Sequence, residues 1–296
     1  MIKINTNKIL IPVDFSKTAN RAIHHGAFMA QLTKGQIILL NVQKRSELLD
    51  IILPAINMKD TSVITDFLEQ KLEMMAQEIK KEYGIRVSTF VSTGNITSEI
   101  VNLANEKRVD LIVMGTEGKD STNDLFMGSN SYRTITKSPI PVMTVREDVS
   151  KKGYGKILLP IDTSPHTRQK VRAAISLADK FASKIHVLCM LKPNEEESKY
   201  KMEVIISQIE KLAQKKGVPV SSEIQKTTNP ASTTLVISKK IKANLIISMT
   251  DQNTGFSGLL LGNYVHQLLN EAKVPVIAVP PVINEDQMSN SMGGLF

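Results

Sequence analysis

Short, nearly all-apolar runs alternate along the chain with longer stretches in which apolar residues recur at helical spacing. The apolar runs of the first half predict strands at about Lys8–Val13, Gln36–Val42, Arg86–Ser92, Asp110–Gly115 and Ile140–Val145. The stretches between them predict helices at about Ser16–Thr33, Ser62–Tyr83, Thr97–Lys107 and Ser129–Lys137. Strands without polar alternation are typical of a parallel sheet that helices cover on both faces.

The same series of elements occurs twice. Lys8–Ser16 (KILIPVDFS) matches Lys156–Ser164 (KILLPIDTS), and Asp110–Gly115 (DLIVMG) matches Asn244–Met249 (NLIISM). Such self-similarity predicts a tandem duplication. We therefore expect an α/β protein made of two tandem doubly wound domains, each a five-stranded parallel sheet flanked by helices.

The domain boundaries follow from this repeat. The first domain is predicted over 1–148 and the second over 149–283, with a polar, mobile tail over 284–296. The offset between matching positions falls from 148 to 134 along the chain, so the first copy is 14 residues longer. We assign that excess mainly to a loop over about Glu47–Thr61.

Doubly wound sheets bind ligands beyond the carboxyl ends of their strands, at the point where the strand order reverses. Asp14, Val42 and Gly115 all stand at such strand ends in the first half. Three separate segments are therefore expected to converge on one crevice.

A glycine pattern lies at that crevice: Gly115, two residues, Gly118, nine residues, then Gly128 and Ser129. Gly115 is predicted to allow a sharp turn after the strand, and Gly118 to let a phosphate approach the backbone. Ser129 opens a predicted helix, where it is expected to cap the helix and to donate its hydroxyl to a phosphate.

Asp14 is the fixed carboxylate that we assign to this crevice, for a ribose hydroxyl or a phosphate-bound Mg²⁺. The alternative is that glycines only punctuate loops in an α/β domain. The full set, with a strand before it and a helix after it, is far more restrictive than two glycines alone.

The second half departs from the pattern. Met249, Gln252 and Asn263 stand where the first half has Gly115, Gly118 and Ser129, although Gly262 persists. We predict that the second half has lost nucleotide binding and serves as a structural partner. Gly255 and Gly258 in the same loop leave open a shifted anion site.

These motifs resemble those of the universal stress protein family, in a tandem two-domain form. The nucleotide motif of that family, Gly-x₂-Gly-x₉-Gly-Ser/Thr, matches the first half in full, and the segments VDFS at 13–16, DLIVMG at 110–115 and PIPV at 139–142 are also similar to it. The resemblance covers both halves, over about 5–148 and 154–281. It implies the adenine-nucleotide alpha-hydrolase-like fold and an ATP, ADP or AMP ligand, with or without Mg²⁺.

The resemblance also implies roles for individual residues. Adenine is expected near Pro12 and Val42, with Asp14 facing the ligand and carrying the metal through the nucleotide. The residues expected around the phosphates and the strand before them are Met114, Gly115, Gly118, Gly128, Ser129, Asn130 and Ser131.

Family members commonly pair domains through the last strand. Val274–Val279 is therefore expected to lie against Ile140–Val145 as an intramolecular pseudo-dimer. An apolar edge strand also needs a cover, because a bare one promotes aggregation. A homodimer of the whole chain fits the symmetry habits of proteins but has no specific residue support.

Composition narrows the remaining classes. The single cysteine, Cys189, lies in an apolar run and is expected to be a packed thiol rather than a nucleophile. Without an apolar run of membrane-spanning length or a leader at Met1, we expect no membrane association and a cytoplasmic location.

Charge is uneven along the chain: residues 149–296 carry 19 basic against 12 acidic residues, and residues 1–148 carry 18 against 17. The absence of tryptophan leaves little for base stacking, so we interpret the basic half as a solvated surface and do not expect nucleic-acid binding.

The leading functional hypothesis is an ATP-binding regulatory protein of the stress response, acting through an unknown protein partner. Two alternatives stay open. One is a slow ATPase or autokinase using Asp14, a metal and Ser129 or Ser131; the other is a nucleotide-free interaction scaffold. With no general base assigned, we expect at most weak hydrolysis.

Overall fold

The structure is a computed structural model, and it describes residues 4, 6–44, 62–116, 127–146, 153–194, 197–250, 252–253 and 260–281. Four expectations lie outside these residues: the loop over Glu47–Thr61, the tail over 284–296, the placement of Gly118 and the shifted anion site around Gly255 and Gly258. No helix within the described ranges is long and apolar enough to cross a membrane.

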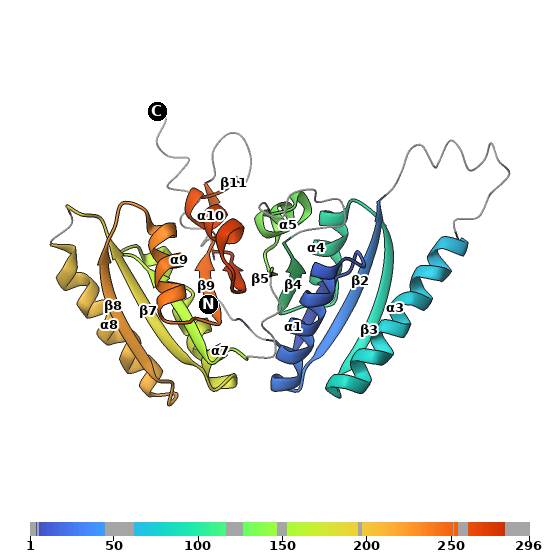
Figure 1. Cartoon of the computed structure of the whole chain (residues 1–296), viewed down its shortest axis with the longest axis horizontal. Helices are drawn as coiled ribbons and strands as arrows, with labels where there is room; N and C mark the ends of the chain where they lie inside the picture. Colours follow the sequence, from blue (N-terminus) through green and yellow to red (C-terminus); the bar gives the residue numbers. More distant parts are fainter. Residues whose placement is uncertain are drawn as a thin grey trace.

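Ten strands form one continuous sheet across both halves (Figure 1). The first half supplies β1 (Lys8–Pro12), β2 (Gln36–Lys44), β3 (Arg86–Gly94), β4 (Leu111–Gly115) and β5 (Val142–Val145). The second half supplies β6 (Lys156–Ile161), β7 (Lys184–Leu191), β8 (Val220–Lys226), β9 (Leu245–Met249) and β12 (Val276–Val279). The order is β3-β2-β1-β4-β5-β12-β9-β6-β7-β8, and pairing is parallel within each half. The doubly wound α/β prediction is confirmed.

Helices cover both faces of this sheet. In the first half they are α1 (Lys17–Thr33), α3 (Ser62–Tyr83), α4 (Ile96–Glu106) and α5 (Ser129–Lys137). In the second half they are α6 (Pro165–Arg168), α7 (Val171–Lys180), α8 (Ser198–Gln214), α9 (Pro230–Lys240) and α10 (Asn263–Glu271), with a small hairpin of β10 (Gln252–Asn253) and β11 (Leu260–Leu261).

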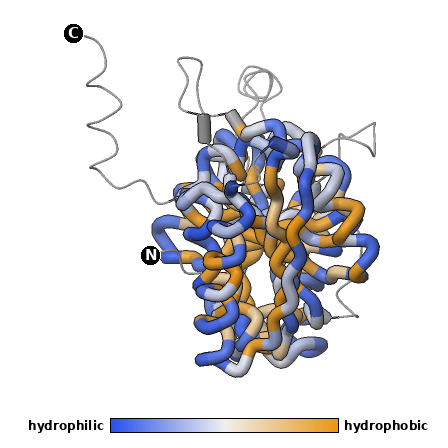
Figure 2. The backbone as a smooth tube through the Cα atoms, turned by 90° about the vertical axis from the view of Figure 1, so that its left-hand side faces the viewer, coloured by the Kyte–Doolittle hydropathy of each residue, from blue (hydrophilic) through white to orange (hydrophobic). Residues whose placement is uncertain are grey.

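Two hydrophobic clusters, one on each face, hold these layers together. One joins α1, α3, α7 and α8 to the sheet, and the other joins α4, α5, α9 and α10 to the opposite face. Both clusters contain residues of both halves, so the apolar core is shared between them. Figure 2 shows hydrophobic stretches of the backbone in the interior of the molecule, seen from its end. The nearly continuous apolar strands of the sequence are therefore explained by burial on both faces.

The two halves meet where β5 pairs with β12. Their pairing is antiparallel, with Met143 opposite Ile277 and Val142 opposite Ala278. All four side chains are buried. The expected contact between the last strands of the two halves is thus present, and each strand covers an edge that would otherwise be open.

Gly115, at the end of β4, allows α1 to approach the sheet closely. A Cβ atom placed on Gly115 would lie 2.8 Å from the Cβ atom of Thr18 and 3.0 Å from its carbonyl carbon. The backbone of Gly115 does not have the left-handed conformation that favours glycine. Glycine at this position is therefore required for close packing, whereas the path of the predicted turn lies outside the described residues.

The second half shows what happens without this glycine. Met249 stands at the matching position and is buried, with 2% of its surface exposed. The helix after β6 is then not continuous as α1 is: it divides into α6 and α7, with Gln169 and Lys170 between them. The glycine that allows the close approach in the first half and the continuous helix are thus both missing in the second half.

Gly115→Ala is expected to destabilise the protein by about 1–3 kcal/mol, because the new methyl group meets backbone as well as side-chain atoms. Urea unfolding followed by circular dichroism measures this. Gly155→Ala is the matched control: its nearest contact is Asn244 Oδ1 at 3.8 Å, so we expect no loss or a gain of about 0.4–1 kcal/mol. Equal stability of the two variants would contradict the packing role of Gly115.

Candidate functional site

The reversal of strand order places the predicted crevice between β1 and β4. β1 pairs with β2 on one side and with β4 on the other, all parallel. Asp14 after β1, Val42 near the end of β2 and Gly115 at the end of β4 therefore lie at one edge of the sheet. All three residues are partly exposed there, and Pro12 is as well. Met114, by contrast, is buried in the sheet.

The loop that carries Asp14 is fixed by its own hydrogen bonds. The Ser16 amide donates to Asp14 Oδ1 at 3.0 Å, and Ser16 Oγ accepts from the Ala19 amide at 3.1 Å as the cap of α1. Phe15 between them has a positive φ of 62°. A short hydrogen-bonded turn of this kind orients the carboxylate with little freedom.

Asn41 is a site residue that the sequence analysis missed. Its side-chain amide donates to the Val13 carbonyl oxygen at 2.7 Å, and it accepts from Gln43 Nε2 at 2.5 Å. A buried asparagine inside the apolar β2 was the available signal, since a buried amide has to be hydrogen-bonded. Asn41 thereby ties the end of β1 to β2 beneath the crevice.

The start of α5 corrects one expectation. Gly128 is the N-cap, and no side chain caps this helix, so the prediction that Ser129 caps it is wrong. Ser129 and Asn130 are exposed in the first turn. Without a capping side chain, amides of this turn are available to an anion, which the positive end of the helix dipole also favours.

Two hydrogen bonds attach this helix start to the end of β4. Ser131 is buried and donates its hydroxyl to the Gly115 carbonyl oxygen at 2.8 Å, and the Gly128 amide donates to the Thr116 carbonyl oxygen at 2.6 Å. The structure thus brings Gly115, Gly128, Ser129, Asn130 and Ser131 together. Ser131 has a clear structural role in this contact.

Hydrogen bonds between the two halves connect the segments that precede α5 and α10 to the opposite helix. The amide of Met127, just before Gly128, donates to Asn270 Oδ1 of α10 at 2.8 Å. At the matching position of the second half, the Leu261 amide is hydrogen-bonded to the Tyr132 hydroxyl of α5 at 3.3 Å. The Tyr132 ring also meets His266 edge-on, with centroids 5.6 Å apart. The first-half crevice is therefore held in part by residues of the second half.

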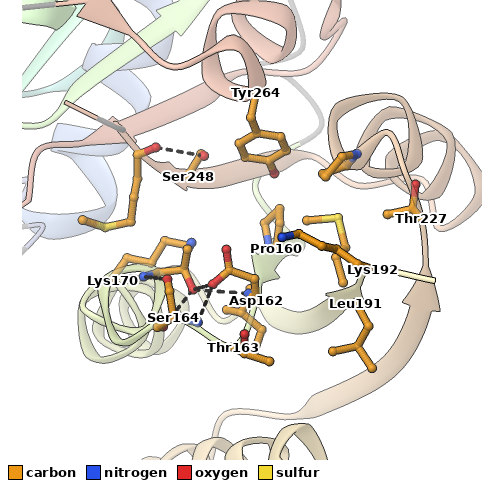
Figure 3. A pocket seen from close by; sticks show the side chains of 15 residues that line it. Pro160, Asp162, Thr163, Ser164, Lys170, Leu191, Lys192, Thr227, Ser248 and Tyr264 are labelled. Carbon is orange, nitrogen blue, oxygen red and sulfur yellow. Dashed lines mark hydrogen bonds between the residues drawn. The ribbon is translucent and has the colours of Figure 1, made fainter. Parts of the chain in front are cut away.

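The second half has a cavity of about 300 Å³ at its own reversal of strand order (Figure 3). Its lining includes Pro160, Asp162, Met190, Ser248 and Met249, which match Pro12, Asp14, Val42, Met114 and Gly115 in sequence position. The second half therefore keeps a cavity at this place, although Met249 stands where the first half has Gly115.

The spatial arrangement also forms a serine–histidine–carboxylate cluster that the sequence analysis did not identify. His186 Nδ1 is 2.8 Å from Ser221 Oγ, and its Nε2 is 3.0 Å from Glu223 Oε1. Burial opposes the charge of Glu223, but hydrogen bonds from His186 and Gln225 and the charge of Lys240 outweigh it, so the pKa of Glu223 is lowered. None of the three residues lines the second-half cavity.

Two other expectations concern titratable and metal-binding groups. Cys189 is completely buried, and burial raises the pKa of its thiol to about 12, as a packed core cysteine requires. Among the described residues, no three His, Cys, Asp or Glu side chains are grouped to hold a metal ion.

Comparison with known proteins extends the sequence resemblance. The model of the universal stress protein family matches residues 5–146 and 153–280. A universal stress protein of Methanocaldococcus jannaschii is 29% identical over 153 residues, which cover 47% of this chain and 94% of the relative. A second universal stress protein of that organism is 30% identical over 143 residues, which cover 47% of this chain and 82% of the relative.

Solved structures agree over nearly the full length. The chain matches the crystal structure of a universal stress protein from Archaeoglobus fulgidus with a TM-score of 0.74 and 20% identity, covering 93% of this chain and 99% of that one. A putative universal stress protein from Pseudomonas aeruginosa matches with a TM-score of 0.64 and 18% identity, covering 96% and 95%. Likeness at this identity shows a shared fold, and the two family matches in sequence span most of the chain. The chain therefore belongs to the universal stress protein family.

Proposed function

We propose that the first half binds an adenine nucleotide, ATP or its di- or monophosphate, and that the chain acts as a nucleotide-responsive regulator of a stress response. The observation that carries this proposal is the uncapped start of α5, which stands beside the strand ends that present Asp14 and Val42. A helix start with unpaired amides favours phosphate through hydrogen bonds and through the helix dipole.

The proposed roles follow the positions of the residues. Pro12 and Val42 provide an apolar contact for the adenine ring, at the ends of β1 and β2. The amides at Ser129 and Asn130 face the phosphates. Gly128 stands just before them with its own amide bonded to Thr116, and Gly118 is assigned from the sequence motif alone.

Asp14 is assigned to a ribose hydroxyl or to Mg²⁺ that the phosphates hold. A carboxylate is a suitable ligand for that hard cation, which usually keeps several waters and phosphate oxygens as its other ligands. The fixed loop around Asp14 supports this assignment, because one of its oxygens already accepts the Ser16 amide and so has a defined direction.

Regulation is proposed to act through the contact between halves. Binding that orders the start of α5 stabilises one arrangement of Met127 against Asn270, and thereby of α5 against α10. A partner that distinguishes this surface would respond to the nucleotide. Hydrolysis is expected to be slow, since we assign no residue as a general base.

Calorimetric titration with ATP and Mg²⁺ tests the binding itself. We expect heat of binding that saturates at one nucleotide per chain. The absence of heat at millimolar nucleotide would refute the proposal and favour the scaffold reading.

A pair of matched variants tests the assignment to the first half. Gly118→Glu is expected to abolish ATP binding, because it adds both bulk and negative charge where phosphates are proposed to lie. Gln252→Glu makes the same change at the matching position of the second half and is expected to leave the affinity unchanged. Equal effects in the same titration would mean that the site is assigned to the wrong place.

Asn270→Ala tests the contribution of the second half. It removes the acceptor of the Met127 amide, so we expect ATP affinity to fall about three- to ten-fold, which is the net value of one hydrogen bond. Tyr132→Phe is the control, because it removes the matching bond to Leu261 in the other half. If Asn270→Ala weakens binding no more than Tyr132→Phe does, Asn270 does not position the site.

A further inference from the structure

The second-half cavity combines charged, hydroxyl and apolar groups in one small volume. Hydroxyl groups of Thr227 and Tyr264 and the charged side chains of Asp162, Lys170 and Lys192 line it. Figure 3 shows the ends of Asp162, Lys192 and Tyr264 turned toward the same open space. We propose that this cavity binds a small organic carboxylate, one singly charged acidic head on a compact apolar body, and that Lys170 and Lys192 recognise the head.

Lys170 is the central observation. Only 2% of its surface is exposed, which is rare for a lysine. The first half has Ala22 at the matching position, inside the continuous helix α1. Lys170 instead stands at the break between α6 and α7, where it borders the cavity. The second half therefore differs from the first at this position both in the break of the helix and in the lysine.

A buried ammonium group favours an anionic ligand. Moving a charge out of water costs several kcal/mol, and an anion held at hydrogen-bond distance offsets part of this cost. Lys170 and Lys192 also interact with other groups of the protein. A ligand would join these interactions, and the proposal does not require either amine to be free.

The net charge of the lining residues indicates the charge of the ligand. Two lysines and one aspartate among the lining residues leave a formal charge of +1. Asp162 Oδ1 already accepts from the Ser164 amide and from the Thr167 hydroxyl, both at 2.8 Å, which fixes the direction of the carboxylate. One negative charge on the ligand neutralises the remaining positive charge.

The volume and the apolar wall of the cavity indicate the size and character of the uncharged part of the ligand. About 300 Å³ lies at the lower end of the volumes of small-molecule sites. The apolar part of the wall comes from Pro160, Met190, Leu191, Pro230 and Met249. A nucleoside triphosphate carries several negative charges, more than the lining residues balance. The cavity also has Met249 in place of the glycine of the first-half motif. A compact apolar body with one carboxylate matches both the volume and the charge.

Methionine methyl groups provide a direct readout in the full chain. Met190 and Met249 line the cavity, whereas Met114 and Met127 report on the first half. With ¹³C-methyl methionine, assigned by Met→Leu variants, we expect benzoate, phenylacetate or 3-methylbutanoate to shift the Met190 and Met249 signals. The neutral amide of each acid is expected to shift them much less.

Variants test the role of the charge. Lys170→Met is expected to weaken carboxylate binding at least about ten-fold, the effect of losing a hydrogen bond to a charged group. Lys239→Met, at an exposed position on α9, is the control and should leave the affinity unchanged. Should Lys170→Met fail to fold, Lys192→Met serves in its place. It is expected to lower the affinity for the carboxylates and to leave the affinity for the amides unchanged.

The outcomes are separable from those for the first half. The proposal is overturned if no carboxylate shifts Met190 and Met249, if acids and amides bind equally, or if neither lysine variant changes the affinity. It is also overturned if ATP shifts these two signals, because the second half would then be a nucleotide site. Failure of ATP to bind the first half leaves the carboxylate result unaffected.

Discussion

The antiparallel pairing of β5 with β12 is the constraint on which the rest of the structure depends. It joins two parallel sheets into one, and it buries the apolar edges that each half would otherwise expose. It also brings α5 and α10 together, so that Asn270 of one half holds the amide of Met127 in the other. Neither half therefore presents its crevice independently of its neighbour.

A single position explains much of the divergence between the halves. Gly115 lets α1 run close past the end of β4, whereas the second half has Met249 at this position and an interrupted helix. The interruption places Lys170 beside a cavity that still exists. Helices α5 and α10 both begin without a side-chain cap, so the two crevices differ instead at Gly115 and Met249 and in the buried Lys170 of the second half.

The sequence predicted the parts of this structure that depend on local pattern and on repetition. Strand and helix positions and the doubly wound fold follow from apolar runs and from the duplication, whereas the contact of Ile140–Val145 with Val274–Val279 was expected from the family resemblance. Contacts between distant residues leave no such pattern: Asn270 and Met127 are 143 residues apart. A lysine in a helical stretch is usually a surface residue, so the sequence did not reveal the burial of Lys170. It also did not reveal the close packing of Gly115 against Thr18.

The central claim is that the two crevices differ in chemistry, with the nucleotide confined to the first. Native mass spectrometry of the intact chain at saturating ATP tests this most directly, because it counts bound ligands. The account predicts one nucleotide per chain, lost on Gly118→Glu. A chain that carries none, or one that carries two, would contradict it.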